Sequence, residues 1–120
     1  MRTPNQIIHL IQRHLTPDLL KPEYQRRLTS RTRPFYGHCY VATESLYYLL
    51  GGPASEWTPT YVHHEGSTHW FLVHQRTGEI LDVTAAQFHR PPPYQHGLGC
   101  GFQKYPSDRT RTLLARLALR

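Results

Sequence analysis

The sequence has few of the features that mark secreted or membrane proteins. It contains only two cysteines, Cys39 and Cys100, among 120 residues, too few for the disulfide framework of a small secreted domain. No stretch approaches the roughly 20 apolar residues that a membrane-spanning helix needs. Residues 1–15 also lack the apolar run and cleavage site of a signal peptide. We therefore expect a cytoplasmic protein with no membrane partner, in which both thiols stay reduced.

Acidic residues are also scarce. The sequence has eight Asp and Glu against fourteen Lys and Arg, which gives a net charge of +6. A basic surface favours an acidic or anionic partner. The basic residues are scattered rather than gathered in one run, which makes nucleic acid the less favoured partner. Arg31 and Arg33, which precede Cys39, either meet an anionic substrate or simply face solvent.

Motifs for metal and nucleotide binding are absent. None of the nine histidines belongs to a Cys-x-x-Cys or His-Glu-x-x-His pattern. The glycine-rich segment 97–101 does not stand between a strand and a helix, as a dinucleotide-binding loop would. We therefore expect no metal and no cofactor, and we interpret His63, His64 and His74 as solvated residues at strand edges.

The patterns that are present fit one domain over residues 1–120. Apolar periodicity, caps and turn residues predict helices and strands in a definite order. The expected helices span residues 4–15, 22–28, 39–50 and 108–119, and the expected strands span 58–63, 68–73 and 79–83. Because helices precede a small antiparallel sheet and one helix follows it, the fold class is α+β. Residues 90–101, rich in proline and glycine, are expected to form a loop.

Cys39 lies at the start of an expected helix, and Gly51-Gly52-Pro53 is a strong signal for the end of that helix. The first turn of a helix offers unpaired N–H groups and the positive end of the helix dipole, which stabilise a thiolate and can hold an oxyanion. The position alone also fits a small cysteine buried in the core. Glu44, in the same helix, is expected to face solvent.

Two strands after this helix supply a histidine and an aspartate. His69 lies near the start of the first strand, and Asp82 interrupts the apolar run of the second. A two-residue hairpin loop places them on one face of the sheet, and a four-residue loop over residues 75–78 brings them closer. A three-residue loop would put them on opposite faces. A cysteine nucleophile needs a histidine base and a residue that orients it.

The segments GHCYVATESLYYLLGG, THWFLV and EILDVT together resemble the papain-like superfamily of cysteine hydrolases and transferases, most of all its transglutaminase-like branch. The resemblance covers about residues 37–84 and implies a papain-like domain, with a nucleophile helix packed on a small antiparallel sheet. It implies that Cys39 is the nucleophile, His69 the general base and acid, and Asp82 the residue that orients His69. PYQHGLGCGF and PSDRT resemble segments of small phage and bacterial proteins.

The resemblance implies a cysteine-dependent acyl-transfer enzyme, which would be an amidase, a peptidase or a transamidase. Its substrate would carry an amide or ester and could be a protein or peptide. The alternative is a protein of another class on the same scaffold: a non-catalytic, basic binding protein, such as a phage-type inhibitor of a host factor.

Several aromatic residues are candidates for the walls of the site. Members of the superfamily often complete the oxyanion hole with an upstream glutamine or aromatic residue. No glutamine lies within ten residues before Cys39, so Tyr36 and His38 are the candidates. Trp70 is either a core residue or a pocket wall. We also expect the loop over residues 90–102 to pack near Cys39 and to supply Tyr94 or Phe102 as a wall.

Overall fold

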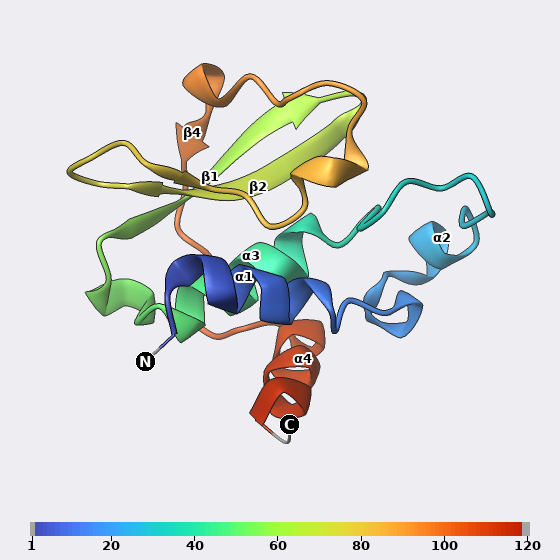
Figure 1. Ribbon diagram of the computed structural model, residues 1–120, viewed down its shortest axis with the longest axis horizontal. Helices are drawn as coiled ribbons and strands as arrows, with labels where there is room; N and C mark the ends of the chain where they lie inside the picture. The colour runs from blue at the N-terminus through green and yellow to red at the C-terminus, as the bar shows by residue number, and fades with distance from the viewer. Residues whose placement is uncertain (1, 119–120) are drawn as a thin grey trace.

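Helix α3 (Cys39–Leu49) occupies the centre of the computed structural model, which describes residues 2–118 (Figure 1). It packs against the sheet on one side and against helices α1 (Pro4–Gln12) and α4 (Asp108–Ala118) on the others. A short helix, α2 (Pro22–Gln25), lies at the periphery, in the segment that leads to the loop before α3. The sequence-based expectation of an α+β fold is confirmed.

The sheet has four antiparallel strands in the order β3-β2-β1-β4. Their bounds are Trp57–His64 for β1, Ser67–His74 for β2, Ile80–Leu81 for β3 and Leu98–Gly99 for β4. The first three match the expected strands, although β3 is shorter. Strand β4 lies inside the segment for which the sequence predicts only a loop. Its two residues pair with Thr60 and Tyr61 and cover the free edge of β1.

Helix α1 is shorter than expected and ends at Gln12 instead of residue 15. The ring Nδ1 of His14 lies 2.9 Å from the carbonyl oxygen of Leu10, the acceptor that the His14 N–H would use in a continuing helix. That N–H instead bonds the Ile11 oxygen in a tighter turn. The last expected helix is α4, and its expected end at residue 119 lies outside the described residues.

The two faces of the sheet bury different kinds of side chain. Leu72 of β2 and Leu81 of β3 join the apolar core between the sheet and the helices. His69 and Phe71 have the opposite parity in β2, and they are fully buried against Phe88 and Tyr94 on the other side of the sheet. The helical layer therefore supplies the core, while the segments after β3 cover the face that carries His69.

Glu44 does not face solvent as expected; it is completely buried. Its Oε1 accepts a 3.0 Å hydrogen bond from the backbone N–H of Ser107, the residue before α4, and the hydroxyl of Tyr40 donates to Oε2 at 3.4 Å. The sequence-based expectation was wrong because the face of α3 that carries Glu44 lies against the start of α4. The carboxylate thus satisfies a backbone donor there.

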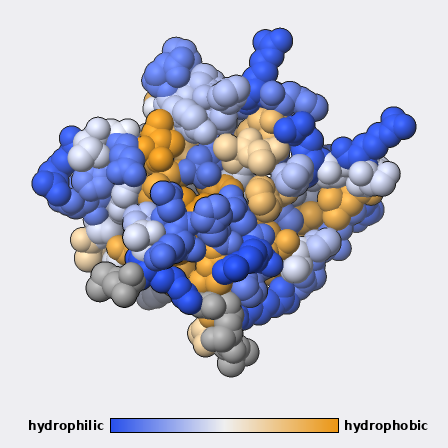
Figure 2. All heavy atoms as spheres, viewed as in Figure 1, coloured by the Kyte–Doolittle hydropathy of each residue, from blue (hydrophilic) through white to orange (hydrophobic). Residues whose placement is uncertain are grey.

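Hydrophilic side chains cover most of the face shown in Figure 2, and apolar residues appear in separate patches between them. Among residues 2–118, none of the helices has the length and apolar character that would let it cross a membrane.

Candidate active site

The hairpin between β2 and β3 has the four-residue loop, the arrangement that brings His69 and Asp82 closest. Leu72 pairs with Leu81 and Val73 with Ile80, and the backbone N–H of His74 donates to the Glu79 oxygen at 2.8 Å. In this register Asp82 lies opposite Phe71, one step along the same face from His69. The two candidate residues therefore share one face of the sheet.

His69 and Asp82 form a buried hydrogen-bonded pair. Nε2 of His69 lies 2.7 Å from Oδ2 of Asp82, and the two side chains are 0% and 6% exposed. A second carboxylate oxygen, Oδ1, accepts from the backbone N–H of Thr84 at 3.2 Å. The carboxylate is thus fixed by the chain that follows it, and it occupies one nitrogen of the imidazole. The other nitrogen, Nδ1, remains for a different partner.

Cys39 is the first residue of α3, and the loop before it is tightly constrained. Gly37 has a positive φ of 78°, and a Cβ there would approach Leu20 Cδ2 to 3.0 Å, so only glycine fits without strain. Phe35 also has a positive φ, 65°. His38 makes no side-chain cap to α3, and the N–H groups of the first turn are left for other acceptors.

The thiol of Cys39 lies beside His69. Its Sγ is 3.4 Å from the carbonyl oxygen of Thr68, the residue before the histidine, and the neutral thiol donates there. Burial on its own lowers the pKa of His69, but its hydrogen bonds to Asp82 and Cys39 and their charges outweigh that effect and raise the pKa to about 9. An imidazolium is therefore stable at neutral pH.

Two further side chains hold this pair from outside. The hydroxyl of Tyr94 donates to Oδ2 of Asp82 at 2.8 Å. The amide of Gln87 donates from Nε2 to the Thr84 hydroxyl at 2.9 Å, and the same nitrogen lies 3.5 Å from Nδ1 of His69. Oε1 of Gln87 accepts from the backbone N–H of Gly37 at 3.4 Å. Gln87 therefore links the histidine to the loop that precedes the cysteine.

Cys39 opens into a cavity of about 420 Å³, called the Cys39 cavity below. Three tyrosines and one tryptophan form its aromatic part, and Lys21 and Arg109 are its charged lining residues. Ser67, Thr68, Gln87, Gln103 and Ser107 contribute polar groups. The aromatic residues are Tyr24, Tyr36, Tyr40 and Trp70. A half-buried thiol at the wall of such a cavity is accessible to a small acyl group.

The structure separates the aromatic residues that the sequence grouped as pocket walls. Tyr36 and Trp70 line the Cys39 cavity. Phe102 stands behind this wall, with its ring 5.2 Å from those of both Trp70 and Tyr40. Tyr94 contacts Asp82 and Phe71 instead, and it does not line the Cys39 cavity. The loop after β3 therefore supports the site at two separate points.

His38 precedes Cys39 in the sequence, but its side chain does not line the Cys39 cavity. Its side chain is 6% exposed, and Nε2 lies 3.0 Å from the carbonyl oxygen of Thr16. Burial lowers the pKa of His38, which favours the neutral form of the ring. Of the two residues suggested for the oxyanion hole, only Tyr36 reaches the cavity that Cys39 lines.

Gln87 is the residue of this site that sequence reasoning missed. It lies in a single 3₁₀ turn, Ala85–Gln87, so no periodic pattern points to it.

Among residues 2–118, no cluster of three or more His, Cys, Asp and Glu side chains is arranged to hold a metal ion. Comparisons of this chain with protein-family models, curated proteins and solved structures found no significant match.

Proposed function

We propose that this protein is a cysteine-dependent acyl-transfer enzyme built on a papain-like core, with Cys39, His69 and Asp82 as its catalytic triad. The observation that carries the proposal is the buried 2.7 Å hydrogen bond between His69 and Asp82, with Cys39 at the start of α3 and close enough to raise the pKa of His69. A nucleophile, a base and an orienting carboxylate in this order are the groups that acyl transfer needs.

The first half of the reaction forms an acyl-enzyme. The Cys39 thiolate attacks the carbonyl carbon of an amide or ester, and the carbonyl π electrons move onto the oxygen. N–H groups of the first turn of α3, the positive end of the helix dipole, stabilise that oxyanion, because Cys39 and Tyr40 at the start of α3 line the cavity. The His69 imidazolium then gives its Nδ1 proton to the leaving amine or alcohol as the carbon–heteroatom bond breaks.

The second half releases the acyl group. His69, now neutral, takes a proton from the incoming nucleophile, which attacks the thioester carbon and displaces the Cys39 thiolate. Water as the nucleophile makes the protein an amidase or peptidase, and an amine makes it a transamidase. No redox step or cofactor enters this cycle. We place it in the cytoplasm, where a reducing environment keeps a free thiol active.

A chromogenic ester tests the proposal without knowledge of the natural substrate. Incubation with p-nitrophenyl acetate should release a burst of nitrophenolate close to one equivalent per chain, because acylation precedes a slower deacylation. Mass spectrometry of the quenched protein should place one acetyl group on Cys39. The Cys100→Ala variant should behave like the wild type, since Cys100 is exposed and outside the cavity.

Cys39→Ala and His69→Gln should lose the burst while they keep a cooperative thermal unfolding transition. A non-catalytic binding protein makes the opposite prediction. If acetylation of Cys39 is no faster than that of Cys100, and His69→Gln leaves it unchanged, the catalytic proposal is rejected in favour of a binding function.

A further inference from the structure

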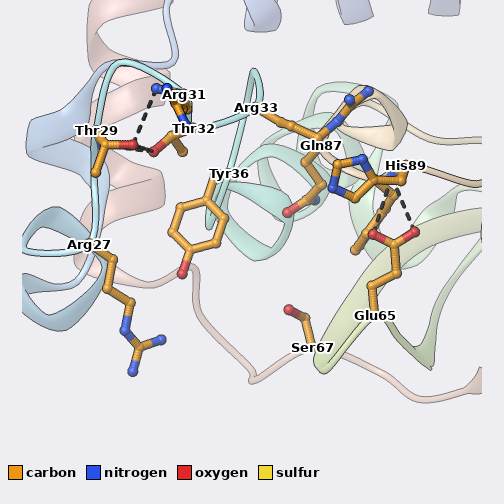
Figure 3. Close-up of a pocket in the computed structure, with 11 residues that line it drawn as sticks. Arg27, Thr29, Arg31, Thr32, Arg33, Tyr36, Glu65, Ser67, Gln87 and His89 are labelled. Carbon is orange, nitrogen blue, oxygen red and sulfur yellow. Dashed lines mark hydrogen bonds between the residues drawn. The ribbon is translucent and has the colours of Figure 1, made fainter.

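A second cavity, of about 400 Å³, opens next to the Cys39 cavity. The two cavities share the side chains of Tyr36, Ser67 and Gln87, so they meet along one boundary. Figure 3 shows the second cavity, with Arg27, Thr29 and Thr32 on one side, Glu65, Gln87 and His89 on the other, and Arg33 beside the second group. A molecule whose carbonyl lies at Cys39 therefore has a direct path into it.

Arginine dominates the lining of this second cavity, called the arginine cavity below. Arg27, Arg31 and Arg33 line it, as does one carboxylate, that of Glu65. Three guanidinium groups and one carboxylate give it a formal charge of +2 when His89 is neutral. A concentration of one sign of charge around a concave surface attracts ligands of the opposite sign.

Glu65 is not the counter-ion of these arginines. Its carboxylate accepts hydrogen bonds from the backbone N–H groups of His89, at 3.1 and 3.2 Å, and of Arg90, at 3.0 Å. Nε2 of His64 lies a further 3.4 Å from the same carboxylate. Glu65 therefore holds the chain after Phe88 in place. Its carboxylate is occupied by these donors and not by the arginines.

In the part of the chain that the structure describes, the three guanidinium groups have no carboxylate partner. Within residues 2–118, no Asp or Glu oxygen lies within 4.0 Å of Arg27, Arg31 or Arg33. Nε of Arg33 donates to the Ala86 carbonyl at 3.2 Å, which leaves its terminal nitrogens available. The turn that carries Arg31 is fixed by Thr29, whose Oγ1 accepts from the Arg31 backbone N–H at 3.2 Å.

The Cys39 cavity has the same sign of charge. Lys21 and Arg109 line it, and no carboxylate does so among the described residues. Nη1 of Arg109 donates to the carbonyl of Leu19, which holds this charge in place. A substrate that crosses both cavities therefore meets a net positive charge in each.

We propose that the arginine cavity binds an anionic oxygen group, a carboxylate or a phosphate, on the substrate whose carbonyl Cys39 attacks. This inference rests on the proposed function and adds the substrate class to it. Arginine suits such a group because its planar fork donates two parallel hydrogen bonds to carboxylate or phosphate oxygens. Peptides with an acidic side chain near the scissile amide, and phosphorylated acyl compounds, both present this chemistry.

Three thiol-reactive probes that differ only in their far end test the inference. They are N-iodoacetyl-β-alanine, its uncharged carboxamide and N-iodoacetyl-aminoethyl phosphate. In wild-type protein at low salt, Cys39 should react about two- to fivefold faster with an anionic probe than with the carboxamide, the size expected for one exposed charge pair. The preference should shrink at high salt because the charges are screened.

Arginine variants locate the effect. Arg31→Gln and Arg33→Gln should bring the rate ratio of anionic to neutral probe toward one, while Arg31→Lys retains part of it. Arg76→Gln is the matched control: it removes the same charge from an exposed arginine that pairs with Glu56 outside both cavities. It should keep the full preference. Thermal midpoints of all variants check that each remains folded.

The outcomes separate this inference from the proposed function. If the carboxamide reacts with Cys39 far faster than with Cys100 but no anionic probe is preferred, the arginine cavity is not an anion site and the enzyme proposal stands. If Arg76→Gln lowers the ratio as much as Arg31→Gln, the effect is general charge attraction and the site is rejected. A preference for only one anionic probe identifies the group, carboxylate or phosphate.

A separate titration tests the cavity without the thiol. Cys39→Ser protein is titrated with N-acetyl-β-alanine and with inorganic phosphate, and the arginine Nε–H signals are followed by NMR. Saturable shifts at Arg31 and Arg33 support an anion site even if Cys39 proves unreactive. Shifts no larger than those of Arg76 contradict it.

Discussion

The hydroxyl of Tyr94 donates a 2.8 Å hydrogen bond to Oδ2 of Asp82, the oxygen that also lies 2.7 Å from Nε2 of His69. One carboxylate oxygen thus joins the loop after β3 to the histidine of β2. Burial, with the Asp82 charge, raises the pKa of Tyr94 well above its ordinary value. The phenol therefore remains a donor at neutral pH, and it shares the Oδ2 atom of Asp82 with His69.

Tyr94→Phe should weaken this arrangement without removing it. The change deletes a hydrogen bond to a buried charged group, so we expect a loss of about 1 to 2 kcal/mol in the free energy of unfolding. Acetylation of Cys39 should slow less than in Asp82→Asn, because loss of the hydroxyl alone leaves the carboxylate in contact with His69. Chemical denaturation and the ester burst measure the two effects. Equal loss of burst in both variants would mean that Tyr94 does more than position Asp82.

The raised pKa of His69 makes stability depend on pH. Its folded value of about 9 lies above the ordinary 6.5, so the stabilisation is fully present below about pH 6.5 and is lost as the pH rises through 9. The difference corresponds to about 3 kcal/mol. Urea denaturation at pH 6.5 and 9 should show this decline, and Asp82→Asn should show a smaller one. Parallel curves for the two proteins would contradict the account.

Gln87 is expected to act as a positioning residue. Its amide contacts Nδ1 of His69 and the N–H of Gly37, so Gln87→Ala should slow acetylation of Cys39 by about tenfold, or 1.4 kcal/mol. Because the same amide is only half-buried, the thermal midpoint should change little. The pKa of His69, followed by NMR of its ring protons, should also change in Gln87→Ala. A variant that only lost stability would leave that pKa unchanged. Gln87→Glu has the same length. Compared with Gln87→Ala, it should restore the acceptor for the Gly37 N–H but not the N–H donor beside His69.

Gly97 and Gly101 offer a matched pair of substitutions in the loop after β3. A Cβ on Gly97 would lie 2.7 Å from Thr60 Cγ2 and 2.8 Å from Phe71 Cζ, whereas one on Gly101 meets nothing within 4 Å. Gly97→Ala should therefore cost about 1 to 3 kcal/mol of stability through overpacking. It should also disturb His69, which stacks on Phe71. Gly101→Ala should be close to neutral in thermal unfolding, and similar losses for both would argue against this packing of the loop.

The sequence located α3 and the hairpin strands well, because strong local signals define them. Paired glycines and a proline end α3, and β-branched and aromatic residues mark β1 and β2. The loop length of the hairpin could not be chosen, since Thr77-Gly78 also suits a two-residue turn. In the structure, Nδ1 of His74 accepts from the backbone N–H groups of Arg76 and Thr77, at 3.2 and 3.3 Å, and stabilises the four-residue loop.

The parts of the site that sequence reasoning missed depend on contacts between distant segments. Gln87 reaches Gly37 only because the turn after Asp82 folds back over β2. Glu44 is buried only because α4 begins against it. Neither contact has a local pattern, since tertiary packing places both residues. The same reason separates Tyr94 from the Cys39 cavity, although its hydroxyl does reach Asp82.

The pH dependence of Cys39 alkylation tests the central claim most directly. The rate constant for iodoacetamide should be measured for Cys39 and Cys100 between pH 5 and 10, in wild-type protein and in His69→Gln. The account predicts that wild-type Cys39 reacts faster than the exposed Cys100 at pH 6 to 7, because the His69 imidazolium stabilises the thiolate. It also predicts that His69→Gln removes this advantage at low pH. Equal rates for the two thiols at pH 6 to 7, unchanged in His69→Gln, would contradict a thiolate–imidazolium pair.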